Sequence, residues 1–169
     1  MADRIQIVDK QDNPIGAASR QEAWEKGLYY RLVHVILRDE RGNFLLQKRS
    51  ASKVLYPNRW TNAASGHVDE GEEYETAAAR ELNEELGITA DLEYVGNVFI
   101  HLEMDGKNIN QFNGVFQAYI DHDTSFELQT DEVSEVRWFT LEELKEKTTA
   151  APEEFTPAMA EALNKFYLA

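Results

Sequence analysis

The amino-acid sequence predicts a single α+β domain, a mixed sandwich of a sheet and helices, and three observations support it. Short runs of branched and aromatic residues recur along the chain, as they do in strands. One strongly helical segment, residues 74–86, lies between these runs, and two shorter helical patterns close the chain. The 169 residues contain no repeat and no linker long enough to separate domains. We therefore expect one domain over residues 1–169, with strands in hairpins around a central helix.

The first half of the chain predicts three strands, one capped helical turn and a long loop. The strands are expected at residues 5–8, 32–37 and 44–46. Between the first two, the segment Ser19–Gly27 offers a hydroxyl residue for a helix N-cap and a glycine for its C-cap. Residues 39–43 carry a turn signal, so the second and third strands should pair as a hairpin. A loop follows over residues 50–59.

The second half predicts three longer strands and three helices. Residues 74–86 hold no Gly or Pro, have acids in the first turn and meet Gly87 at the end, so a helix is expected there. The strands are expected at residues 92–100, 109–120 and 133–139. The closing helices are expected at 141–147 and 157–168, where Thr156 is a suitable N-cap and Pro157 a suitable first residue.

Composition and charge narrow the classes of function. The chain has 17 basic and 31 acidic residues, a formal charge of −14, so its field repels nucleic acid and anionic membranes. It has no cysteine, which excludes disulfides, thiolate metal sites and a cysteine nucleophile. Charged residues interrupt the first ten positions, where a signal peptide needs an apolar core. We expect a soluble, cytoplasmic protein with neither nucleic acid nor membrane as a partner.

The helix over residues 74–86 has an acidic flank beside its apolar face. On a helical wheel the core face holds Ala78, Ala79, Leu82 and Leu86. Glu81, Glu84 and Glu85 lie on the adjoining flank. A solvated charged face is the ordinary explanation, but it predicts basic partners, and these glutamates are like-charge neighbours with only Arg80 close by. A hard divalent cation such as Mg²⁺ or Mn²⁺ would compensate the repulsion and bridge the carboxylates to phosphates.

A longer motif surrounds this flank. From Gly66 to Ile88 the chain reads Gly-His-Val-Asp-Glu-Gly-Glu, seven further residues, then Arg-Glu-Leu-Asn-Glu-Glu-Leu-Gly-Ile. This segment resembles the Nudix hydrolase family at every defined position of its signature, G-x5-E-x7-R-E-U-x-E-E-x-G-U, with U aliphatic. The resemblance implies an α/β/α sandwich with the motif on a loop, a helix and a loop. It also implies hydrolysis of a nucleoside diphosphate linked to another moiety.

The resemblance implies a role for each matching residue. Three of the motif's four defined glutamates would bind Mg²⁺ or Mn²⁺ and take part in catalysis: Glu81, Glu84 and Glu85. Gly66 would join the metal site by bringing its backbone close, because it lacks a side chain. Glu72 and Arg80 would brace the loop against the helix. The carboxylate that accepts the water's proton is left open, and acids outside the motif are further candidates: Asp131, Glu132 and Glu135.

A basic segment precedes the motif. Lys48, Arg49, Lys53 and Arg59 lie within twelve residues, and Arg and Lys side chains suit phosphate oxygens. The stretch from Arg49 to Asn62 is similar to isopentenyl-diphosphate isomerases, a branch of the same superfamily, in which the matching Arg and Lys hold the substrate's diphosphate. This similarity implies Arg49 and Lys53 as the substrate-binding pair.

Three departures argue against isomerase chemistry. The isomerase cysteine is matched by Ser65, its histidine ahead of the first long strand by Tyr30, and its proton-handling glutamate by Gln111. A serine hydroxyl is a far weaker acid than a thiol, so it does not replace the chemistry directly. His67 matches an isomerase metal ligand but is expected here as a loop histidine. The closest resemblance is to bacterial Nudix hydrolases of isomerase-like type.

These observations together predict a metal-dependent pyrophosphohydrolase that cleaves a diphosphate linkage, in a nucleoside diphosphate derivative or similar small organic diphosphate, by water attack on phosphorus. The alternatives are an isopentenyl-diphosphate isomerase-like enzyme and a non-catalytic nucleotide-binding module. Four aromatic residues are candidates for stacking on a base, although core packing is the ordinary explanation for each: Trp24, Tyr29, Tyr56 and Phe112. The resemblance suggests a second copy of the chain as the one protein partner, in a homodimer.

Overall fold

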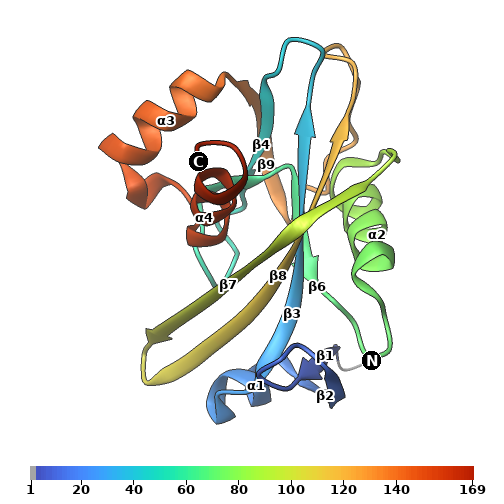
Figure 1. Ribbon diagram of the computed structural model, residues 1–169, viewed down its shortest axis with the longest axis vertical. Helices are drawn as coiled ribbons and strands as arrows, with labels where there is room; N and C mark the ends of the chain where they lie inside the picture. Colours follow the sequence, from blue (N-terminus) through green and yellow to red (C-terminus); the bar gives the residue numbers. More distant parts are fainter. Residues whose placement is uncertain (1–2) are drawn as a thin grey trace.

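A computed structural model describes residues 3–169, in which nine strands form one mixed sheet and four α-helices pack around it (Figure 1). The strands are β1 (Arg4–Val8), β2 (Pro14–Ser19), β3 (Tyr29–Arg38), β4 (Phe44–Arg49), β5 (Trp60–Asn62), β6 (Ala64–His67), β7 (Glu93–Met104), β8 (Lys107–Tyr119) and β9 (Val133–Phe139). The helices are α1 (Arg20–Lys26), α2 (Tyr74–Leu86), α3 (Leu141–Ala150) and α4 (Pro157–Phe166), with a 3₁₀ turn η1 (Pro152–Glu154) before the last. The predicted α+β sandwich is confirmed.

Strand β3 organises the sheet. It pairs in parallel with β8 along its whole length and antiparallel with β1, β4 and β6. β7 and β8 form a long antiparallel hairpin, and β9 pairs with β4. Because parallel strands need a crossover, the chain between β3 and β8 leaves the sheet and returns, carrying α2 over one face.

The layers follow from the alternation of side chains along β3. Val33, Val35 and Leu37 point to the face that α2 covers, whereas Ile36 points to the opposite face, which α4 covers. Figure 1 shows α2 on one side of the sheet and α3 with α4 on the other. A third apolar cluster joins β1, α1 and the lower part of the sheet. Two of these clusters meet near the ends of β5 and β6, where the functional side chains gather.

Helix α2 begins and ends where the sequence predicts, at Tyr74 and Leu86, and Gly87 ends it with φ of 69°. One prediction for its core face is wrong. Ala79 is exposed, and Ala77 is buried in its place. The reason is that Glu85 also turns inward and is buried, so the packed face is centred closer to the acidic flank than apolar residues alone indicate.

The N-terminal hairpin is fastened to α2 by a buried charge network. The Asp12 side chain accepts hydrogen bonds from Arg31 Nε at 2.7 Å and from the Tyr74 hydroxyl at 2.9 Å. The Arg31 guanidinium also lies over the Tyr74 ring, 4.5 Å from its centroid. These contacts fix the first turn of α2 against β1, β2 and β3, and so hold the motif helix in place.

Three strands and η1 are absent from the sequence prediction. β2 is an edge strand rich in small residues, and β5 and β6 are only three and four residues long, so none gives a clear period-2 pattern. The long hairpin extends beyond the predicted bounds because it turns at Asp105 and Gly106, both with positive φ. No helix within residues 3–169 is long and apolar enough to cross a membrane.

Candidate active site

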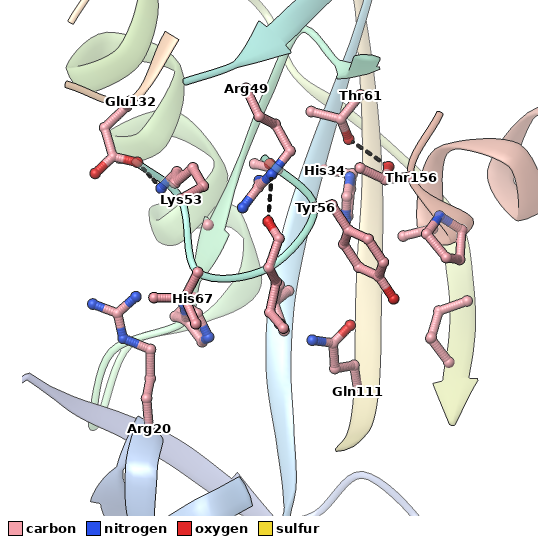
Figure 2. Close-up of a pocket in the computed structure, with 18 of the residues that line it drawn as sticks. Arg20, His34, Arg49, Lys53, Tyr56, Thr61, His67, Gln111, Glu132 and Thr156 are labelled. Carbon is pink, nitrogen blue, oxygen red and sulfur yellow. Dashed lines mark hydrogen bonds and ion pairs between the residues drawn. The ribbon is translucent and has the colours of Figure 1, made fainter. Parts of the chain in front are cut away.

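Two adjoining cavities form the candidate site. The first, of about 280 Å³, lies among loop 50–59, β6, the start of α1 and the start of α4, and we call it the cationic cavity (Figure 2). The second, of about 290 Å³, lies between β6 and the flank of α2 and is lined by Asp69, Glu81 and Glu84, so we call it the acidic basin. The two share six lining residues: Arg20, Lys53, Ser65, Gly66, His67 and Glu132. The cavities are therefore two parts of one continuous site.

Gly66 and Glu81 form the tightest contact in the acidic basin. A Cβ atom on Gly66 would lie 2.1 Å from Oε1 of Glu81, so only glycine leaves room for this carboxylate. Burial and, next, the charge of Glu85 together raise the pKa of Glu81 to about 7, although Arg80 opposes both effects. The carboxylate is held in a position where its charge is poorly compensated.

Glu85 and Glu84 occupy different environments. Glu85 is buried, and its two oxygens accept hydrogen bonds from Gln47 Nε2 at 3.0 Å and from the main-chain N–H of Ser65 at 2.7 Å. Burial nevertheless raises its pKa. Glu84 is half-exposed and lies 3.3 Å from Arg80 Nη1. The three motif glutamates thus differ, with Glu85 tied to the sheet and Glu84 open to solvent.

Arg80 joins the motif loop to the motif helix. Its Nε and Nη2 donate to the two oxygens of Glu72, each at 2.9 Å, and Nη2 also donates to the His67 carbonyl at 2.9 Å. Nη1 donates to Glu81 at 2.7 Å. Hydrogen bonding to Glu72 is the main cause that raises the pKa of Arg80, so it stays a cation. These contacts join the motif loop to α2 through Glu72 and Arg80, the two residues for which the family resemblance implies a bracing role.

The donor set of the acidic basin suits a hard divalent cation. Its carboxylates repel one another, and burial of Glu81 makes their charge unfavourable without a counter-ion. His67, beside them, has a buried Nε2 atom with no hydrogen-bond partner among residues 3–169. Within the same residues, no three His, Asp or Glu side chains form a ready-made cage. Such an incomplete carboxylate set fits Mg²⁺, which takes one or two carboxylates and completes its shell with water and phosphate oxygens.

His67 lies at the end of strand β6 rather than in a loop, contrary to expectation. Its ring stacks on Tyr30 with centroids 5.6 Å apart. Burial and the nearby charges of Arg20, Lys53 and Arg49 lower its pKa to about 3, so the imidazole is neutral at physiological pH. A neutral imidazole keeps a lone pair that a metal or a ligand proton can use.

The cationic cavity places three basic side chains around one space (Figure 2). Arg49 and Lys53 are those that the sequence predicts, and Arg20 joins them from the start of α1. Burial lowers the pKa of Lys53, and the charge of Arg49 lowers it further. Arg49 donates from Nε to the Leu55 carbonyl at 3.1 Å, and burial lowers its pKa too. An anion bound between these groups would relieve their mutual repulsion.

The far side of the cationic cavity is neutral. Tyr30, which is fully buried, accepts hydrogen bonds at its hydroxyl from Trp24 Nε1 at 2.9 Å and Gln111 Nε2 at 3.0 Å. His34 has both ring nitrogens engaged, Nε2 with Asn113 and Nδ1 with Asn62, and burial lowers its pKa to about 4. Burial also raises the pKa of Tyr30 above its usual value, so neither this phenol nor the His34 imidazole titrates near neutral pH.

The three candidate acids outside the motif differ in whether they line the site. Asp131 and Glu132 both line the cationic cavity, and Glu132 lines the acidic basin as well. Glu135 points elsewhere, lying half-exposed on β9 with Lys48 Nζ 3.9 Å away. Its candidacy as the base is therefore not supported by its position.

The four aromatic residues proposed to stack on a base also differ in whether they line the cavity. Trp24 and Tyr56 line the cavity, whereas Tyr29 and Phe112 stack with Phe99 away from it. Arg20 and the Thr61–Thr156 hydroxyl pair, 2.9 Å apart, also line the cavity, and none of them is predicted from the sequence as a site residue.

The fold is an α/β/α sandwich in which the acidic flank of α2 and the basic residues of loop 50–59 line one continuous site. The NUDIX domain family model matches residues 28–159, and the chain belongs to the Nudix family. A Deinococcus radiodurans crystal structure shares the fold, with a TM-score of 0.79 at 24% identity, covering 97% of this chain and 99% of that one. A MutT protein from Methanosarcina mazei aligns with a TM-score of 0.65 at 27% identity, covering 82% and 92% of the two chains.

Curated relatives carry three kinds of name. Isopentenyl-diphosphate Delta-isomerase 2 of Photorhabdus laumondii is 34% identical, covering 97% of this chain and 92% of the relative. An uncharacterized Nudix hydrolase of Pseudomonas aeruginosa is 37% identical, with coverage of 98% and 94%. Prenyl-diphosphate phosphatase of Methanosarcina mazei is 34% identical, with coverage of 96% and 94%. The chain is a Nudix hydrolase by family, and two of these relatives are named for organic diphosphates.

Proposed function

We propose that this protein is a metal-dependent pyrophosphohydrolase that cleaves the anhydride bond of a small organic diphosphate. The observation that carries the proposal is the opposition of two walls in one continuous site. Arg49 lines only the cationic cavity, Glu81 and Glu84 line only the acidic basin, and Lys53 lies where the two cavities join. The basic side chains contact the anionic substrate directly, and the acidic side chains contact it through a bound cation. A chain of charge −14 can therefore bind a polyanionic ligand.

The residues divide the work of hydrolysis. Arg49, Lys53 and Arg20 hold the diphosphate and fix its orientation. Glu81 and Glu84, with the Gly66 backbone and Glu85 behind them, hold Mg²⁺ or Mn²⁺. When bound, the cation neutralises phosphate charge and lowers the pKa of water. A water oxygen bonds to the terminal phosphorus, the bond from that phosphorus to the bridging oxygen breaks, and a carboxylate accepts the water's proton. The products are inorganic phosphate and an organic monophosphate.

The lining of the cationic cavity favours an apolar organic group. Beside polar side chains such as Thr61, Gln111 and Thr156, the lining includes the apolar groups of Trp24, Leu32, Leu55, Ile100 and Ala158. These apolar groups suit a short hydrocarbon chain. A relative of 34% identity is named for prenyl-diphosphate phosphatase activity. Short prenyl diphosphates are therefore the substrates we propose, ahead of nucleoside diphosphate derivatives.

Isomerisation of isopentenyl diphosphate is the second candidate, favoured by relatives with that name. It requires a proton donor and acceptor at the substrate's double bond. Ser65, Tyr30 and Gln111 occupy the positions that match the isomerase groups, and the last two hydrogen-bond each other in a neutral network. We therefore place hydrolysis first. A nucleotide-binding module without catalysis comes last, because Glu81, Glu84 and Glu85 are all present.

Incubation with isopentenyl diphosphate and Mg²⁺, followed by proton and phosphorus NMR, tests the proposal. We expect isopentenyl phosphate and inorganic phosphate, and no reaction when EDTA is added. Stoichiometric dimethylallyl diphosphate would establish the isomerase instead. A panel of nucleotide sugars and dinucleotides under the same conditions tests the preference for an apolar group. The homodimer and the cytoplasmic location stay predictions, to be measured by light scattering and cell fractionation.

A further inference from the structure

Glu132 lies at the junction of the two cavities and is held there by its backbone. The main-chain N–H of Ser50 donates to the Glu132 carbonyl at 3.0 Å, and the Ser50 hydroxyl donates to the Asp131 carbonyl at 2.7 Å. On the other side, the N–H of Glu132 donates to Gln129, whose own N–H donates to the Glu85 carbonyl at the end of α2. The segment 129–132 therefore connects the loop over residues 50–59 to helix α2, and Glu132 has a fixed place between them.

The Glu132 carboxylate is paired with Lys53, one of the cations of the proposed diphosphate site. Its Oε2 forms an ion pair with Lys53 Nζ, drawn as a dashed line in Figure 2. Lys53 is mostly buried, with 24% of its side chain exposed, and Arg49 lies close enough to lower its pKa. Lys53 thus needs a counter-ion whenever no ligand is bound. A ligand phosphate that binds Lys53 Nζ must share this cation with the Glu132 carboxylate or displace it.

We propose that Glu132 is a specificity-determining residue that competes with ligand phosphates for Lys53 and so excludes singly phosphorylated anions. The proposal rests on the proposed function, because it takes Arg49 and Lys53 as the diphosphate site. A lone phosphate exchanges one anionic partner of Lys53 for another, so it gains little. One phosphate of a diphosphate makes the same exchange at Lys53. Its other phosphate forms an additional ion pair with Arg49. The freed Glu132 carboxylate also lies beside the bound anion. Their repulsion raises the binding free energy that an anion must supply at Lys53.

The test measures anion binding without turnover. Isothermal titration calorimetry in EDTA follows methylenebisphosphonate, which cannot be hydrolysed at its bridge, and inorganic phosphate. The variant Glu132→Gln keeps the shape of the side chain and removes its charge. We expect it to bind the bisphosphonate about fivefold more tightly than the native protein, equivalent to about 1 kcal/mol, and to bring phosphate binding into the measurable range.

Two controls separate competition from a general change of charge. Asp131→Asn removes the same charge from the neighbouring residue, whose carboxylate makes no ion pair within residues 3–169, and should tighten binding less than twofold. In a Lys53→Met background, Glu132→Gln should lose its advantage over Asp131→Asn, because the contested cation is absent. Thermal unfolding of each variant verifies that it is folded.

The outcomes distinguish this proposal from the proposed function. If the native protein binds the bisphosphonate but Glu132→Gln binds it equally or more weakly, Glu132 has a structural role and the competition is refuted, while the diphosphate site stands. Equal gains in Glu132→Gln and Asp131→Asn would refute it in the same way. If no folded variant binds the bisphosphonate in EDTA, the cationic cavity does not hold a diphosphate by itself and the competition is refuted, whereas turnover of isopentenyl diphosphate with Mg²⁺ decides the proposed function separately.

Discussion

Substitution of Gly66 by Ala tests the geometry of the acidic basin with a single methyl group. The new Cβ would lie 2.1 Å from Cδ and Oε1 of Glu81, whereas ordinary contact begins near 3.4 Å, so the carboxylate must move by about 1.3 Å. Glu81 is a flexible side chain and Gly66 does not have a positive φ, so the backbone tolerates alanine. A displacement of about 1 Å in a catalytic group reduces turnover by roughly 10²-fold.

The stability of this variant should change little. The displaced carboxylate loses its 2.7 Å hydrogen bond with Arg80, but Arg80 keeps both oxygens of Glu72 and the His67 carbonyl. The lost contact is partly offset by about 0.4–1 kcal/mol from the stiffer unfolded chain. We expect Tm to stay within about 4 °C of the native value.

Phosphate release from isopentenyl diphosphate at saturating Mg²⁺ measures the effect on kcat. Because Gly66→Ala acts through Glu81, the double variant with Glu81→Gln should be no slower than Glu81→Gln alone. Native turnover in folded Gly66→Ala would refute the reasoning. So would losses that multiply in the double variant, because they would show that Gly66 acts independently of the carboxylate.

Three further predictions concern individual side chains. Glu85→Gln should lower the free energy of unfolding by about 1–3 kcal/mol, and by more than Glu81→Gln does. The reason is that the new amide group would face one of the two donors that now bind Glu85. Equal urea midpoints for the two variants would contradict this. His34 has a pKa of about 4 against 6.5 in the unfolded chain, so its contribution is complete above pH 6.5 and about 3 kcal/mol is lost as pH falls to 4. Urea unfolding at pH 7 and pH 4.5 should show this loss, and His34→Gln should reduce it; an unchanged pH dependence would count against the assignment. Arg49→Ala should mainly raise KM, whereas Glu81→Gln should mainly lower kcat, in steady-state assays; the reverse pattern would exchange their roles.

The sequence predicts those parts of the fold whose signals are local. Helix α2 has acids in its first turn and Gly87 at its end, so both of its bounds are correct. Ser19 and Gly27 cap α1 as expected, the first through its side chain and the second in the left-handed conformation. β5 and β6 are too short to show a period, and their pairing with β4 and β3 is decided by tertiary contacts.

The site is predictable to the extent that one motif contains it. The motif gives Gly66, Glu81 and Arg80, and the structure brings them into contact. The helical wheel places Glu84 and Glu85 on one flank, but it does not reveal that Gln47 lies in position to bury only the second. Arg20 is likewise beyond sequence reasoning, because the fold of the N-terminal hairpin brings it to the cavity from far along the chain.

Hydrolysis in ¹⁸O-labelled water tests the central claim most directly, that water attacks phosphorus in a metal-dependent reaction. With isopentenyl diphosphate, Mg²⁺ and native protein, we expect mass spectrometry to find one labelled oxygen in a phosphate product and none in the organic alcohol portion. The same incubation with EDTA should give no labelled product. Label on the carbon-bound oxygen of a released alcohol, or full activity with the metal chelated, would contradict the account.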